Sequence, residues 1–73
     1  GDRLPWGKII MRLNKKDHPG EVTQDGIVFN GGRFDMPSPA AKSLTGYDVN
    51  GWRAFRFEHS DGTRQSLDDF RLR

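Results

Sequence analysis

Two turn-forming pairs lie close together in the segment GEVTQDGIVFNGGRFDM, and they constrain the fold more than any other feature of the sequence. Asp25-Gly26 and Asn30-Gly31 are both preferred pairs for two-residue type I′ hairpin turns. A chain that reverses at both pairs forms three short antiparallel strands. The sequence therefore predicts a β-meander over residues 20–36.

Taking both turns literally fixes how the strands of this meander pair. The predicted pairs are Val22 with Phe29, Gln24 with Ile27, Ile27 with Phe34, and Phe29 with Gly32. Because directly paired residues share a face, this register gathers apolar side chains on one side: Val22, Ile27, Phe29, Phe34 and Met36. The opposite side receives Glu21, Thr23, Val28, Arg33 and Asp35. That a single apolar face results supports the prediction of both turns, since a one-residue shift in register would move apolar side chains to the other face.

Residues 8–14 alternate with a period of two, which predicts another strand. One side holds Ile9, Met11 and Leu13, and the other holds Lys8, Ile10, Arg12 and Asn14. Lys15 and Lys16 are then expected in the loop beyond this strand. A helix using Ile9, Ile10 and Leu13 is the alternative. It is disfavoured because Pro5, Gly7 and the His18-Pro19-Gly20 run leave it little length.

The segment PSPAAKSLTGY predicts a short helix. Ser38 is expected as its N-cap, Pro39 at its first position and Gly46 at its end. About two helical turns cannot stand alone, so the helix must pack on the sheet. The side chains expected to make that contact are Ala40, Ala41 and Leu44.

The segment NGWRAFRFE predicts a turn at Asn50-Gly51 followed by a strand over residues 52–58. Its alternation puts Phe55 and Phe57 with Arg53 on one face, and the other face receives Trp52, Ala54, Arg56 and Glu58. An Asp61-Gly62 turn follows, and Ser66 opens a last short helix with Leu67 and Phe70 inward. The fold class expected is α+β: a small antiparallel β-meander, one short helix packed on the sheet and a short C-terminal helix.

Length and composition predict one domain with a thin core. Residues 1–73 contain no cysteine, so neither disulfides nor thiolate zinc sites can supplement packing. No apolar run reaches the roughly 20 residues of a membrane span. We expect a soluble, intracellular module of a larger protein, cytoplasmic or at the nucleoid if bacterial and nuclear if eukaryotic.

The charges are unevenly spread along a chain whose net charge is only +2. Residues 1–16 carry the bases Arg3, Lys8, Arg12, Lys15 and Lys16 against Asp2, and residues 36–57 carry Lys42, Arg53 and Arg56 against Asp48. Such segregation permits a basic face on a nearly neutral molecule, which is typical of proteins that bind polyanions. A mixed, solvated surface is the alternative.

The sequence offers little that could support catalysis. His18 and His59 have no partner at metal-ligand spacing, and the glycines lie in hairpin turns rather than in a phosphate loop. No carboxylate cluster suited to a nuclease metal is present, and Asp68-Asp69 is better placed to favour the dipole of the last helix. We expect a binding module without enzyme activity, metal or cofactor.

From FDMPSPAAKSLTGYDVNGWRAFRFE to the closing SLDDFR, the sequence resembles the RAMA domain (restriction enzyme adenine methylase associated). The residues that carry this likeness are Pro37, Ser38, Ala40, Ala41, Lys42, Gly46, Asn50, Gly51, Trp52, Phe55, Leu67 and Arg71. They occur in the family's order over roughly the last 50 residues. Met36, Pro39 and Phe55 depart from the family pattern, and the start of the chain does not align with it.

The resemblance implies a non-catalytic α+β module attached to restriction-modification or chromatin proteins. Its expected partner is double-stranded DNA, including DNA with a modified base such as methylated adenine, beside a fused or associated methylase or nuclease. A module that docks a methylase, nuclease or chromatin subunit through protein–protein contacts is the alternative function.

The candidate nucleic-acid-binding residues are basic, or polar and aromatic beside basic ones: Lys8, Arg12, Lys15, Lys16, Ser38, Lys42, Asn50, Trp52, Arg53 and Arg56. Lys8 and Arg12 share a strand face, which at most one of Arg53 and Arg56 can join. Ser38 is expected to be an ordinary helix cap. The free backbone N–H groups at that helix start could also receive a phosphate.

Two residues of the Asn-Gly-Trp step keep alternative roles. Trp52 is expected to be a core anchor, with base stacking as the alternative. Asn50 is expected in a left-handed turn, with bidentate reading of adenine as the alternative.

Overall fold

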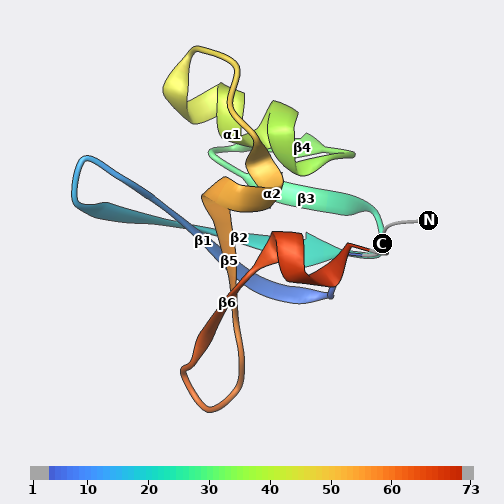
Figure 1. The fold of residues 1–73 in the computed structure, drawn as a ribbon. Coiled ribbons are helices and arrows are strands. Elements are labelled where there is room, and N and C mark those ends of the chain that lie inside the picture. Colours follow the sequence, from blue (N-terminus) through green and yellow to red (C-terminus); the bar gives the residue numbers. More distant parts are fainter. Residues whose placement is uncertain (1–3, 72–73) are drawn as a thin grey trace.

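The computed structural model of the chain describes residues 4–71, within which six strands form one antiparallel sheet (Figure 1). The strands are β1 (Gly7–Leu13), β2 (Lys16–Thr23), β3 (Gly26–Phe29), β4 (Gly32–Phe34), β5 (Phe55–Glu58) and β6 (Arg64–Ser66). Their order across the sheet is β4-β3-β2-β1-β5-β6, so β5 returns to pair with the first strand of the chain. With the short helices α1 (Pro37–Thr45), α2 (Gly51–Ala54) and η1 (Leu67–Phe70), the predicted α+β class is confirmed.

The sequence interpretation missed a hairpin between β1 and β2. Asn14 and Lys15 have φ angles of 52° and 66°, so both adopt the left-handed conformation of a two-residue turn, and Leu13 pairs with Lys16. The expectation that Lys16 lies in a loop is therefore wrong. Pro19 is tolerated in β2 because β3 begins to pair only at Gly20, leaving one side of Pro19 without a strand neighbour.

The first predicted hairpin register is wrong by two residues. Val22 pairs with Ile27 and Thr23 with Gly26, so the turn residues are Gln24 and Asp25. A type I′ turn at Asp25-Gly26 needs positive φ at both residues, whereas only Gly26 has one, at 128°. The Thr23 hydroxyl oxygen accepts from the Asp25 backbone N–H at 3.2 Å and stabilises the turn that forms instead.

The second hairpin is as predicted, with Asn30 at φ 51° and Gly31 at φ 78°, and Ile27 opposite Phe34. Because the error in the first hairpin is an even number of residues, the apolar face is preserved: Val22, Ile27 and Phe29 are buried and Phe34 partly so. Met36 is the exception. It follows the end of β4 and remains 47% exposed.

Helix α1 begins earlier than predicted, with Met36 as its N-cap and Pro37 at its first position. Ser38 is thus inside the first turn and is not the cap. Gly46 ends the helix as expected, at φ 82°, and its N–H donates to the Lys42 carbonyl at 2.8 Å. The buried residues Ala40 and Ala41 form the predicted contact with the sheet.

Residues 51–54 are helical rather than part of a strand, which corrects the interpretation of the Asn50-Gly51 pair. Asn50 is extended, not left-handed, and its side-chain oxygen caps α2 by accepting from the Trp52 N–H at 3.1 Å. Glycine is required at position 51 for a different reason than a turn. A Cβ there would lie 2.2 Å from the carbonyl carbon of Pro37, so α1 and α2 can touch only because it is absent.

The core lies between one face of the sheet, here called the covered face, and the three short helices. At its centre Phe29 and Phe55 meet edge to face with ring centroids 4.8 Å apart. Leu67 of η1 is fully buried as predicted, and the Ser66 hydroxyl caps η1 by accepting from the Asp68 N–H. Figure 1 shows β5 and β6 running steeply across β1 and β2, so the sheet is strongly twisted.

Within residues 4–71, no helix has the length and apolar character needed to cross a membrane.

Candidate nucleic-acid interface

The face of the sheet that points away from the core, here called the open face, gathers basic side chains from β1, β5 and β6. Lys8, Ile10 and Arg12 alternate on it along β1. Arg56 pairs directly with Ile10, and Arg64 pairs with Glu58 in the neighbouring hairpin. Since paired residues share a face, Arg56 is the arginine that joins Lys8 and Arg12. The choice that the sequence left open between Arg53 and Arg56 is thereby decided.

A chain of ion pairs crosses the open face. Lys8 Nζ lies 3.4 Å from Glu58 Oε2, and Arg64 Nε lies 3.6 Å from the other oxygen of the same carboxylate. Asp17 bridges two arginines, with Oδ2 at 3.2 Å from Arg64 Nη1 and Oδ1 at 3.9 Å from Arg12 Nε. These side chains are partly exposed, so each pair contributes only about 0–1 kcal/mol to stability.

Arg56 stands apart from this network. Over residues 4–71 no acidic side chain forms an ion pair with Arg56, whereas Lys8, Arg12 and Arg64 on the adjacent strands each form at least one. It lines a hollow of about 220 Å³ together with Ile10, Arg12, Ala54 and Arg64. Ile10 is only 5% exposed, which indicates that the arginine stems cover it while their charged heads reach solvent.

Lys15 and Lys16 lie at the tip of the β1–β2 hairpin. Lys16 pairs with Leu13, so its side chain is on the opposite side of the sheet from Arg12. Both lysines are exposed, and neither forms an ion pair within the described part of the chain. The hairpin projects as a long loop in Figure 1. Two neighbouring lysines at a projecting turn can follow the backbone of a polyanion without a cost in core packing.

Lys42 and Arg53 do not join this surface. Lys42 lies on α1 and pairs with Asp48 at 3.1 Å, and Arg53 is exposed on α2. Both helices pack on the covered face, so these two cations belong to the other side of the sheet. The predicted set of basic residues is therefore divided between two surfaces.

Three of the predicted contact residues have other roles in the structure. Trp52 is only 5% exposed, which confirms the expected core anchor, and the Arg71 guanidinium carbon lies 5.1 Å from its ring centroid. The start of α1 at Ser38 makes a poor phosphate site, because Pro37 and Pro39 have no N–H and the Ser38 hydroxyl accepts from the Gly51 N–H at 3.0 Å. The side-chain oxygen that Asn50 would need for adenine already caps α2.

Arg64 is a basic residue of the open face that the sequence interpretation missed, as is Arg33 of β4, which pairs with Val28. Arg64 belongs to β6, and β6 itself was not predicted. The signal was present, because the Asp61-Gly62 turn sends the chain back along β5 and places Arg64 opposite Glu58. A strand of only three residues gives too short an alternation to be recognised alone.

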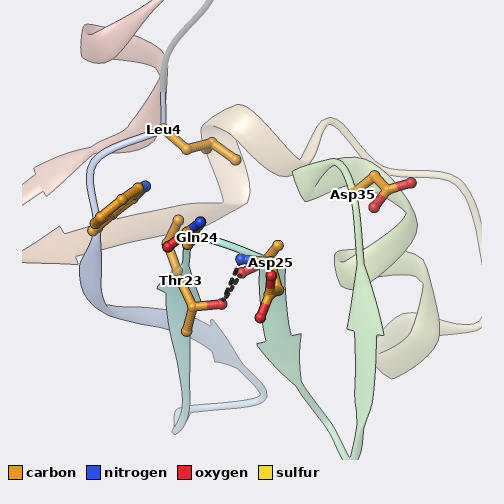
Figure 2. A pocket seen from close by; sticks show the side chains of 8 residues that line it. Leu4, Thr23, Gln24, Asp25 and Asp35 are labelled. Carbon is orange, nitrogen blue, oxygen red and sulfur yellow. Dashed lines mark hydrogen bonds between the residues drawn. The ribbon is translucent and has the colours of Figure 1, made fainter.

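A second hollow, of about 530 Å³, lies where β2 turns into β3 (Figure 2). Leu4, Thr23, Gln24, Asp25 and Asp35 line it, with Leu4 and the two carboxylates coming from separate segments. Trp6 also lines it and is 68% exposed, the largest exposure of any big apolar side chain in residues 4–71. This hollow is acidic and aromatic, unlike the open face.

Comparison with protein-family models, with curated proteins and with solved structures finds no match for this chain. The resemblance to the RAMA domain therefore stays a prediction. Within residues 4–71, no group of three or more histidine, cysteine or acidic residues could hold a metal ion.

Proposed function

We propose that this domain is a non-catalytic DNA-binding module whose open face contacts the phosphate backbone of a duplex. The observation that carries the proposal is the pairing of Arg56 with Ile10, which sets Arg56 between Lys8 and Arg12 on one surface. The RAMA-like motif adds the context of a restriction-modification or chromatin protein, with modified DNA as a partner.

The geometry suits contacts to the backbone better than reading of bases. Arginines on a sheet face present planar forks that fit phosphate oxygens, and the lysines at the hairpin tip supply point charges. Asp17 and Glu58 offset part of this positive charge, which limits non-specific attraction of anions. Arg56 is left as the residue expected to attract a phosphate most strongly. Such contacts give affinity and orientation, whereas sequence or methyl recognition needs additional groups at a groove.

Salt dependence tests the proposal. A labelled duplex, with and without methylated adenine, is titrated with the protein at several salt concentrations. Binding should weaken steeply with added salt, with a slope of about 0.9 per phosphate contacted on the logarithmic scale. If neither duplex binds at low salt, the DNA-binding function is wrong.

The lysine pair at the hairpin tip provides a sharper version of the same test. Changing Lys15 and Lys16 to alanine should lower the salt slope by about one for each phosphate that the protein no longer neutralises. Lys42→Ala is a control that removes a cation from α1. If the double change leaves both the affinity and the slope unaltered, the hairpin tip is not a contact surface.

A second candidate function, docking of a protein partner, is favoured by the hollow beside Trp6. An exposed indole that lines the same hollow as Asp25 and Asp35 suits a lysine or arginine side chain of a partner, through cation–π and ionic contacts. Trp6→Ala separates the two functions. It should leave duplex binding unchanged, whereas a docking role predicts that binding of a basic peptide disappears.

A further inference from the structure

The hollow around Ile10 combines features that suit an anion of small size. The Arg12, Arg56 and Arg64 side chains come from β1, β5 and β6, three adjacent strands. Its volume is about 220 Å³, and its apolar lining consists of Ile10 and Ala54. Apolar groups around a charged site exclude water and strengthen the attraction between unlike charges.

The positive charge of this hollow is only partly compensated. Arg64 engages two carboxylates, Asp17 at 3.2 Å and Glu58 at 3.6 Å. Arg12 reaches only Asp17, at 3.9 Å, near the limit for an ion pair. Arg56 has no carboxylate partner in the described part of the chain. The largest uncompensated charge therefore lies between Arg56 and Arg12.

We propose that this hollow, here called the arginine hollow, binds a single phosphate group, and that Asp17 is a built-in competitor for it. Arg56 would hold the phosphate through its guanidinium fork, and Arg12 would turn from its long contact with Asp17 toward the same oxygens. The inference rests on the proposed function for the phosphate's source, which is either a diester of the duplex backbone or a monoester at a DNA end.

Inorganic phosphate is the simplest probe of the arginine hollow. It is titrated into the protein at low salt in a phosphate-free buffer, with backbone amide and arginine Nε–H signals as the readout. Saturable shifts are expected at Ile10, Arg12, Arg56 and Arg64. Chloride, added to the same ionic strength, should not reproduce them. Shifts absent there, or spread evenly over all basic residues, would overturn the inference.

Arg56→Gln is the decisive variant, because it removes the fork without touching an ion pair. Phosphate binding should weaken by about tenfold, the effect of removing one charge-assisted hydrogen bond. Arg56→Lys keeps the charge and should fall between this variant and the parent. Arg53→Gln removes the same group from α2 and should leave phosphate binding unchanged. Equal weakening in the two glutamine variants would mean a diffuse charge effect and no local site.

Asp17→Asn tests the competitor. Removing the carboxylate charge while keeping the side-chain shape should tighten phosphate binding about twofold to fivefold, the range expected for a partly exposed ion pair. Unchanged or weaker binding would show that Asp17 orders the arginines and does not compete for them.

Two duplexes distinguish the source of the phosphate. One carries 5′-hydroxyl ends and the other 5′-phosphate ends. Equal affinities that both depend on Arg56 indicate a backbone diester, and a preference for the second indicates an end phosphate. If inorganic phosphate shifts the signals of the arginine hollow while neither duplex binds, the proposed DNA-binding function is wrong and the phosphate site is supported. If the duplex binds equally well to the parent and to Arg56→Gln, DNA binding stands and the arginine hollow is not its phosphate site.

Discussion

The covered and open faces of the sheet differ in what fills them, although they share the same strands. On the covered face Ile9, Ile27, Phe29 and Phe55 have almost no exposed surface. On the open face most side chains are charged and partly exposed, and Ile10 is buried at the base of the hollow that Arg12, Arg56 and Arg64 line. Substitutions on the two faces should therefore have separable effects: on stability for the covered face and on binding for the open face.

The largest expected effect is on the covered face. Phe55→Ala removes a fully buried ring that meets Phe29 edge to face. The free energy of unfolding should fall by about 3–5 kcal/mol, which is comparable with the whole stability of a small domain. Urea denaturation measures it. If the variant is unfolded from the start, Phe55→Leu provides a milder change; a decrease below about 0.5 kcal/mol for it would contradict the proposed packing.

Gly51→Ala tests the contact between α1 and α2 that closes the covered face. The new Cβ would meet the Pro37 carbonyl group at 2.2 Å and the Ser38 nitrogen at 2.4 Å, so the two helices must separate. We expect a decrease in unfolding free energy of about 1–3 kcal/mol in urea denaturation, typical of overpacking. Gly31→Ala is not an equivalent control because of its φ of 78°. Ser43→Ala on α1 is a better one, because it adds no atoms and loses only the local hydrogen bond from the Ser43 hydroxyl to the Ala40 carbonyl. Equal stabilities of these two variants would argue against the close contact.

The open face should respond in the opposite way. The double change Arg12→Gln and Arg56→Gln is expected to weaken duplex binding by about tenfold or more, since each phosphate contact involves a charged group. Its unfolding free energy should change by less than about 1 kcal/mol. Lys42→Gln with Arg53→Gln is a charge-matched control on the helical side. If this control pair loses as much affinity, the open face has no special role.

The smallest expected effect is at the loop between β5 and β6. Asp61 Oδ1 accepts from the Thr63 backbone N–H at 3.0 Å and from its hydroxyl at 2.7 Å, and these bonds lower the pKa of the Asp61 carboxyl. A lowered pKa means that this stabilisation is present above the ordinary aspartate pKa and is lost as the pH falls through the lowered value. Asp61→Asn should slightly reduce the acid dependence of unfolding relative to the parent. An identical pH profile would contradict it.

The two Asn-Gly pairs explain how much of the fold the sequence could predict. Asn30-Gly31 forms the expected turn because its neighbours are strands, and the one tertiary hydrogen bond of its side chain, from Asn30 Nδ2 to the Ser43 carbonyl at 3.0 Å, is compatible with that turn. Asn50-Gly51 has the same letters, but Gly51 packs against Pro37 and Asn50 caps a helix, so a tertiary contact overrides the turn preference. The prediction of Ser38 as N-cap is wrong for the same reason, since its hydroxyl accepts from the Gly51 N–H and not from an N–H of its own helix.

The candidate site depended on a pairing that local patterns do not encode. Alternation along β1 correctly put Lys8 with Arg12, but only the antiparallel contact between β1 and β5 brings Arg56 beside them. The ion pairs of Arg64 with Asp17 and Glu58 likewise join separate strands. The sequence showed that basic residues were plentiful, and the sheet order decides which of them share a surface.

Mapping backbone amide shifts on adding a short duplex at low salt tests the central claim most directly. We expect the largest shifts at Lys8, Ile10, Arg12 and Arg56 and at Lys15 and Lys16 of the hairpin tip, with little change at Lys42 and Arg53. Shifts centred on α1 and α2, or no shifts at all, would contradict it.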